Sequence, residues 1–234
     1  MVFFRFMESA IERTKWDSNW DHREPESLSR VRLEEKFEIV TASRHLMLVR
    51  HGQYYTNSKS DEERRLTCLG REQARLTGLR LKELGLPYSL IVQSTMFRAT
   101  ETAQIIANQL PNVPLISCNL LREGAPVDPD PPSEQWTPSA HRVRKDSTRI
   151  EVAFNEYFHR ADSSQKTDSY EVLVCHSNVI RYFLCRALQL PPEAWLRFSL
   201  FHGSTTWLCI GPTGRVSVSM VGDIGHMPAH LMST

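Results

Sequence analysis

The chain has 234 residues, a hydrophobic content of 41% and a formal net charge of +1. This length fits one large domain or two small ones, and the apolar content is sufficient for a substantial core. A net charge near zero gives no electrostatic basis for binding nucleic acid, so no nucleic-acid partner is expected. No apolar run approaches the roughly 18–20 residues that cross a bilayer, so no transmembrane segment is predicted in this chain.

The five cysteines are odd in number and show no short paired spacing. This pattern favours buried free thiols in a reducing compartment over disulfides or zinc ligands. They are Cys68, Cys118, Cys175, Cys185 and Cys209.

Two regions differ in character. Residues 1–44 are rich in charge and show no clear alternation, so we interpret them as an N-terminal extension, with a helix predicted over about 29–40. Residues 45–234 alternate between strand-like and helix-like patterns, and we interpret them as one catalytic domain.

Taken in chain order, apolar runs predict strands at 46–49, 90–92 and 171–175. A helix is predicted over 70–84, ended by Gly85 and Pro87. Apolar residues also recur at helical spacing at 99–110, 150–161 and 179–188. Near the end, segments 205–210 and 215–220 flank Gly211-Pro212-Thr213-Gly214, which predicts a hairpin.

Strands that alternate with helices indicate a three-layer α/β/α sandwich with a mostly parallel central sheet. Ligands bind such sheets beyond the carboxyl ends of the strands. Arg50, His51 and His176 fall at such ends. The segment 119–136 is rich in proline and acids, and we expect a long ordered loop that covers the site.

These residue types together suit the hydrolysis of a phosphomonoester. Arg50 and Arg98 would bind phosphate oxygens, and Arg98 lies in the first turn of a predicted helix, where the helix dipole adds positive charge. His51 is the candidate nucleophile. Glu123 is the candidate proton donor for the leaving oxygen. His176 would stabilise charge on the transferring phosphoryl group.

A metal site is the alternative for the same side chains. His51, His176 and Glu123 could form a two-histidine, one-carboxylate ligand set. Arg50 and Arg98 would repel a cation, so we expect neither a metal nor another cofactor.

The residues resemble those of the histidine phosphatase (phosphoglycerate mutase-like) superfamily, in Arg50-His51-Gly52, in 98–103, at Glu123 and at His176. Within it, the chain is similar to mitochondrial serine/threonine phosphatases, with further matching segments at 16–25, 66–74, 121–132, 159–162, 177–182 and 222–228. The resemblance implies the phosphoglycerate mutase-like fold, a phosphohistidine intermediate on His51 and the site roles given above. It also implies phosphoserine and phosphothreonine proteins as substrates.

The resemblance further implies that a tryptophan-rich multimerisation motif docks on neighbouring subunits and promotes both homo-oligomer assembly and activity. Its residues are Trp16, Asp17, Asn19, Trp20 and Asp21. The implied location is mitochondrial, with association at the outer membrane. Only 15 residues precede Trp16, and if the anchoring segment of the family is absent, the expected location is the cytosol.

Two alternatives for single residues stay open. Glu123 could be a loop carboxylate paired with Arg122. Trp16 and Trp20, spaced one helical turn apart, could anchor the extension to the core of their own chain.

Two alternatives for the function also stay open. The first is a small-molecule phosphatase or a glycerate phosphomutase. Mutases of the superfamily place Arg-His-Tyr after the acid glutamate, whereas this chain has Gly124-Ala125-Pro126, which argues against a mutase. The second is an oligomeric adaptor with little activity.

Overall fold

The computed structural model describes residues 15–24, 40–57 and 60–234. Its centre is a six-stranded sheet with the strand order β3-β2-β4-β1-β5-β6. The strands are β1 (Arg44–Arg50), β2 (Tyr88–Ser94), β3 (Leu115–Cys118), β4 (Ser169–Cys175), β5 (Thr205–Ile210) and β6 (Val216–Asp223). The first four run parallel to one another, and the β5–β6 hairpin is antiparallel. The expected mostly parallel sheet is confirmed.

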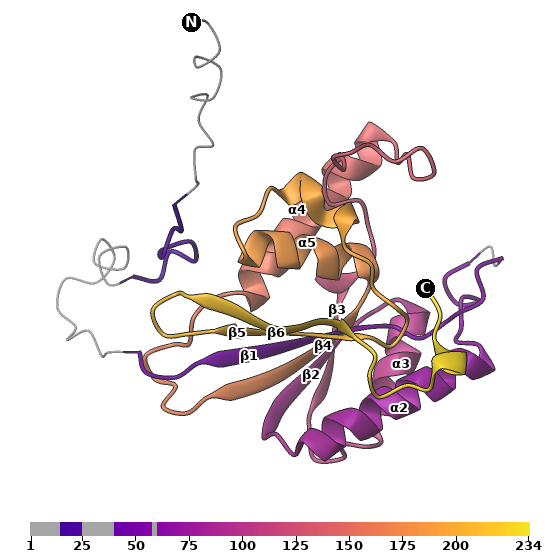
Figure 1. Cartoon of the computed structure of the whole chain (residues 1–234), viewed down its shortest axis with the longest axis horizontal. Helices are drawn as coiled ribbons and strands as arrows, with labels where there is room; N and C mark the ends of the chain where they lie inside the picture. The colour runs from indigo at the N-terminus through magenta and orange to yellow at the C-terminus, as the bar shows by residue number, and fades with distance from the viewer. Residues whose placement is uncertain (1–14, 25–39, 58–59) are drawn as a thin grey trace, which may run out of the picture.

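Helices cover both faces of this sheet. They are α2 (Cys68–Leu84), α3 (Phe97–Ala107), α4 (Ala140–Tyr157) and α5 (Ser177–Ala187), with short 3-10 turns η1 (Asn119–Leu121), η2 (Pro192–Arg197) and η3 (Ala229–Leu231). Figure 1 shows α4 and α5 on one face and α2 and α3 on the other.

Successive side chains of β1 are buried on opposite faces of the sheet. Leu46 and Leu48 join the core beneath α4 and α5, whereas Met47 and Val49 join the core beneath α2 and α3. Successive side chains of a strand point to opposite faces, so a strand buried on both faces is apolar at every position. This explains why the apolar run predicted this strand.

The ends of α2 follow from local capping. The Thr67 hydroxyl accepts a hydrogen bond from the Gly70 N–H, and Gly85 adopts a left-handed conformation with φ 61° at the C-cap. A glycine takes this conformation without the steric cost of a side chain. The helix predicted over 70–84 is confirmed and begins two residues earlier.

Some predicted boundaries were wrong. The apolar stripe 150–161 continues past α4, which ends at Tyr157, because Phe158 and Ala161 are buried after the helix has ended. In the same way α3 ends at Ala107, before Leu110. The edge strand β3 was not predicted.

Other expectations are met. The β5–β6 hairpin forms at the predicted turn, and segment 119–136 is irregular apart from η1. All five cysteines are free, although Cys68 is exposed. The helix predicted over 29–40 falls, except for its last residue, outside the described residues.

Candidate active site

The carboxyl ends of three parallel strands bring the candidate site together. Arg50 pairs in register with Cys175, so His51 and His176 leave β1 and β4 at the same level. The neighbouring strand β2 ends at Ser94 and leads into α3, which carries Arg98. All of the predicted strand-end residues therefore gather at one edge of the sheet.

His51 is held in one tautomer beside an arginine. Its ring is buried, and Nδ1 lies 2.8 Å from the carbonyl oxygen of Gly52, to which it donates its proton. Nε2 is then without a proton and accepts a hydrogen bond of 3.0 Å from the Nε of Arg98. Burial, followed by the charges of Arg98, His176 and Arg50, holds the pKa of His51 well below its ordinary value. The ring is therefore neutral, with a lone pair directed at the cationic side chain.

Arg98 is buried at the start of α3. Its guanidinium lies over the ring of Tyr54, 4.7 Å from the ring centroid. Nη1 lies 3.6 Å from Oδ1 of Asp61, a residue that no sequence pattern singled out. Burial lowers the pKa of Arg98, although the group stays charged at neutral pH.

His176 packs next to the other histidine, with 5.1 Å between the ring centroids of His51 and His176. It is fully buried, and its Nε2 lies 2.8 Å from Oγ of Ser94. Within the described part of the chain, its Nδ1 has no hydrogen-bond partner. Burial, and then the charge of Arg98, keeps the pKa of His176 well below its ordinary value.

The loop that leads into β5 holds Arg50. The guanidinium donates to the carbonyl oxygen of Leu200, and its Nη2 lies 3.0 Å from Nε2 of His202. Burial lowers the pKa of Arg50 to about 10, and burial followed by the charge of Arg50 lowers the pKa of His202 to about 3. The sequence does not single out His202 as a site residue, because its only signal is a Phe-His-Gly step in an irregular segment.

Glu123 lies just after η1, and its Oε1 accepts a hydrogen bond of 3.1 Å from the N–H of Gly124. Arg149 fixes this turn by donating to the carbonyl oxygens of Leu120, Arg122 and Glu123. Burial raises the pKa of Glu123, although the charges of Arg98 and Arg50 oppose the change.

The surface ion pair considered for Glu123 does not form with Arg122. The Nη2 of Arg122 is instead 3.8 Å from Oδ2 of Asp61. In the parts of the chain that the structure describes, no three histidine, cysteine or acidic side chains form a group that could hold a metal ion.

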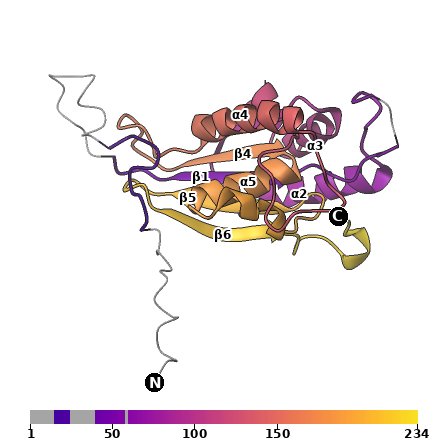
Figure 2. The same cartoon turned by 90° about the horizontal axis from the view of Figure 1, so that it is seen from above.

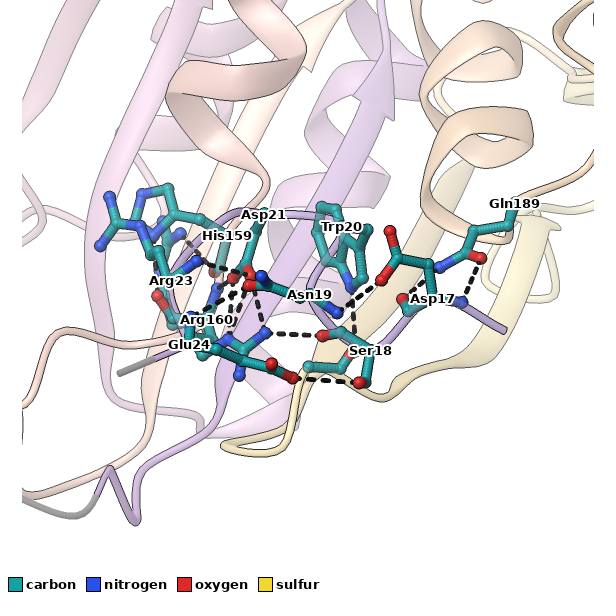
Figure 3. A network of polar contacts seen from close by, with 12 residues as sticks. Asp17, Ser18, Asn19, Trp20, Asp21, Arg23, Glu24, His159, Arg160 and Gln189 are labelled. Carbon is teal, nitrogen blue, oxygen red and sulfur yellow. Dashed lines mark hydrogen bonds and ion pairs between the residues drawn. The ribbon is translucent and has the colours of Figure 1, made fainter. Parts of the chain in front are cut away.

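The tryptophan-rich segment lies away from this site, at the end of the sheet where β1 begins (Figure 2). Figure 3 shows Asp21 directed at Arg160, just beyond the end of α4. Their side chains are almost fully buried, and Arg160 Nη2 lies 2.7 Å from Asp21 Oδ1. The indole Nε1 of Trp20 donates to the carbonyl oxygen of Gly214, and its ring packs 5.9 Å from that of Phe154.

The rest of the segment is held more loosely. The backbone of Asp17 exchanges two hydrogen bonds with the side-chain amide of Gln189, at 2.8 and 2.7 Å. Asn19 Oδ1 accepts from the N–H of Glu24, and Trp16 is 37% exposed. Residues 18–21 form a turn, although Trp16 and Trp20 have the spacing of one helical turn. In this structure the segment contacts the core of its own chain.

The fold is that of a histidine phosphatase. The family model of the histidine phosphatase superfamily (branch 1) matches residues 46–222, most of the chain. Two relatives identify the family within this superfamily. The chain is 52% identical over 225 residues to the human mitochondrial serine/threonine-protein phosphatase PGAM5, across 91% of this chain and 78% of that protein. The protein of the same name from Drosophila virilis is 47% identical over 232 residues, across 93% of this chain and 80% of the relative. The chain therefore belongs to the PGAM5 family within the histidine phosphatase superfamily.

Solved structures agree with this assignment. Phosphoglycerate mutase from Plasmodium falciparum superposes with a TM-score of 0.57 at 34% identity, across 80% of this chain and 96% of that chain. A putative α-ribazole-5′-phosphate phosphatase from Escherichia coli, at 20% identity, shares the fold with a TM-score of 0.58, across 77% of this chain and 97% of that chain.

Proposed function

We propose that the protein is a serine/threonine protein phosphatase that works through a phosphohistidine intermediate. Nε2 of His51 attacks the phosphorus atom of the substrate and forms a nitrogen–phosphorus bond while the ester bond to the serine or threonine oxygen breaks. Arg50 and Arg98 bind the phosphoryl oxygens. In this step the Nε–H of Arg98 turns from His51 to the phosphoryl group, which frees the attacking lone pair.

Glu123 serves as the acid and then as the base. Burial raises the pKa of Glu123 above its ordinary value, which favours the protonated carboxyl group that gives its proton to the leaving alkoxide. The resulting carboxylate then takes a proton from water, which attacks the phosphohistidine and releases inorganic phosphate. His176 assists by donating from Nδ1 to a phosphoryl oxygen, provided that the hydroxyl of Ser94 donates to Nε2 and so fixes this tautomer.

One observation carries the proposal. The Nε2 atom of His51 is free of a proton, because Nδ1 donates to Gly52, and it faces the guanidinium of Arg98 at 3.0 Å. A neutral imidazole supplies the lone pair for an in-line attack, and the buried arginine beside it can bind the phosphate dianion that is attacked. The relatives named serine/threonine-protein phosphatases support proteins as the substrate class.

The test compares a phosphothreonine peptide with 3-phosphoglycerate as substrates of the purified chain, without added metal. We expect the chain to hydrolyse the peptide faster, and His51→Ala to abolish hydrolysis while the protein stays folded. Retained activity in His51→Ala would refute the nucleophile. Equal or faster turnover of small phosphate esters would favour the small-molecule phosphatase, and an inactive folded oligomer would favour the adaptor.

We also propose that residues 1–44 are an extension whose motif joins subunits into a homo-oligomer, and that residues 45–234 are the catalytic domain. Support comes from the contacts of the segment with Arg160, Gly214 and Gln189, because the same segment of a neighbouring chain could make these contacts instead. The double change Trp16→Ala and Trp20→Ala should reduce the particle mass in light scattering and lower turnover together. An unchanged mass would contradict the role in assembly.

The names of the relatives support a mitochondrial location, and we propose association with the outer membrane as a further part of the function. Among the described residues, no helix has both the length and the apolar character that a membrane crossing requires. Imaging of the full chain against outer-membrane and cytosolic markers tests the location, and a purely cytosolic signal would contradict it.

A further inference from the structure

The segment between β1 and α2 brings a carboxylate to the phosphate-binding arginines. Oδ2 of Asp61 accepts a hydrogen bond of 3.4 Å from the backbone N–H of Phe97, at the amino end of α3. Oδ1 lies 3.6 Å from Nη1 of Arg98, and Oδ2 lies 3.8 Å from Nη2 of Arg122. Two guanidinium groups and a helix amino terminus thus surround one carboxylate, which is the kind of environment that binds a phosphate.

The contacts of this carboxylate with the arginines are loose. Charge-assisted hydrogen bonds between nitrogen and oxygen are about 2.7–2.9 Å long, which is shorter than either separation here. Oδ1 of Asp61 and Nη1 of Arg98 are both buried, and neither has a hydrogen-bond partner within the described residues. A buried donor left unsatisfied costs free energy, so an anion that reaches Arg98 at shorter range would be bound in preference to Asp61.

Building on the function proposed above, we propose that Asp61 competes with the phosphoryl group for Arg98 and Arg122, and so sets the affinity of the site for phosphate. The carboxylate occupies part of the positive environment that the substrate needs. When a phosphate dianion binds, Asp61 loses its pairing with Arg98 and repels the incoming charge.

The negative charge of Asp61 weakens the binding of substrate and the binding of released phosphate alike. Arg50, Arg98 and Arg181 act on Glu123 or on one another at this site, and Arg122 acts on His176. Glu123 adds no negative charge while it is protonated. Without Asp61, the arginines would hold substrate and released phosphate more tightly, which lowers KM but slows product release.

A role in positioning alone makes the opposite prediction. If Asp61 only oriented Arg98 toward the site, removing its charge would loosen the guanidinium and weaken the binding of phosphate. Asparagine keeps the shape of the side chain and its acceptor for the N–H of Phe97, but removes the charge. The direction of the change in affinity therefore separates the two roles.

The experiment measures the Kd of inorganic phosphate by calorimetry on the full chain, together with kcat and KM on a phosphothreonine peptide. Asp61→Asn should lower both Kd and KM by about fivefold to tenfold, with kcat unchanged or reduced. Asp61→Glu restores the charge and should recover affinity toward that of the unmodified chain. Glu156→Gln, at an exposed acid on α4, is the matched control and should leave all three values unchanged.

An unchanged or raised Kd in a folded Asp61→Asn protein would overturn the inference. Asp61→Ser provides a second neutral variant if the first does not fold, with the same two outcomes. Because calorimetry needs no turnover, the two proposals fail separately. Tighter phosphate binding by a chain that hydrolyses nothing would keep this inference and refute the function. His51-dependent hydrolysis with phosphate binding unchanged in Asp61→Asn would refute this inference and keep the proposed function.

Discussion

Asp21 and Arg160 form a buried ion pair that ties the N-terminal segment to the body of the protein. The guanidinium donates from both Nε and Nη2 to the carboxylate, at distances of 2.7 to 3.1 Å. Burial raises the pKa of Asp21, but the hydrogen bonds and charge of Arg160 outweigh burial, so that the pKa lies below its ordinary value. The pair therefore contributes stability above the unfolded pKa of Asp21 and loses it as the pH falls through the lower folded value.

Asp21→Asn should release the segment 15–24 from the body of the protein. Removing one partner of a buried ion pair leaves Arg160 uncompensated, at a cost of about 3–5 kcal/mol. We expect faster tryptic cleavage after Arg23, measured by mass spectrometry, with the catalytic domain still folded. Glu24→Gln is the control, because Glu24 accepts only an exposed hydrogen bond from Ser18. Equal cleavage rates in the Asp21→Asn protein and the unmodified chain would contradict the prediction.

Glu123→Gln should lower kcat and at the same time stabilise the protein at neutral pH. Loss of the proton donor should reduce kcat by roughly 10²–10⁴-fold. Because the folded pKa of Glu123 is raised, stability falls as the pH rises from the unfolded to the folded pKa. Glutamine removes this penalty, so the melting temperature at pH 7.5 should rise. A lower melting temperature would show that the ionised carboxylate stabilises the fold.

Acid should destabilise the protein through its buried histidines. The folded pKa of His202 is lowered to about 3, so below the unfolded value of 6.5 the unfolded chain binds the extra proton. The stability is fully present above about pH 6.5, and His202 alone should remove about 2 kcal/mol of it by pH 5. His51 and His176 act in the same direction.

Urea denaturation at pH 7.5 and pH 5 measures this effect. His202→Asn should reduce the difference in the free energy of unfolding between the two pH values. His230→Asn, at an exposed position, should leave it unchanged. The same pH dependence in both variants would show that other groups cause the acid sensitivity.

Gly70→Ala should disturb the site through the backbone. A Cβ atom at Gly70 would collide with the carbonyl group of Gln53, two residues after His51. We expect a destabilisation of about 1–3 kcal/mol and a reduced kcat, because the collision displaces the backbone beside the nucleophile. Gly211→Ala is the control, since its Cβ would make an ordinary contact of 3.5 Å with the carbonyl oxygen of Arg215. Normal stability and kcat in Gly70→Ala would contradict the prediction.

The sequence predicted the central strands well because they are buried on both faces. It missed β3, where Ile116 is 47% exposed and the four residues of this edge strand show no continuous apolar run. The helices predicted from apolar periodicity extended past their true ends for a related reason. Periodicity reports which residues are buried, and Phe158 is buried although the helix ends before it.

The residues of the candidate site also divide into those that the sequence predicted and those that it missed. Arg50, His51 and His176 were found because they directly follow apolar strands, and the structure places them together. Asp61 and His202 could not be found, because each lies in an irregular segment and reaches the site only through the tertiary fold. Ser94 was not singled out either, since its contact with His176 joins two strands far apart in sequence.

The β5–β6 hairpin and the residue just before it contact both the N-terminal segment and the active site. At its turn, Gly214 accepts the indole hydrogen bond of Trp20, and just before β5 the carbonyl oxygen of Ser204 accepts from the N–H of Arg50. A truncation that ends the chain before residue 200 would therefore remove both contacts. The N-terminal segment would lose the acceptor for Trp20, and the active site would lose the acceptor for the backbone of Arg50. Deletion mapping from the C-terminus cannot assign a defect to either one, and only point substitutions can separate them.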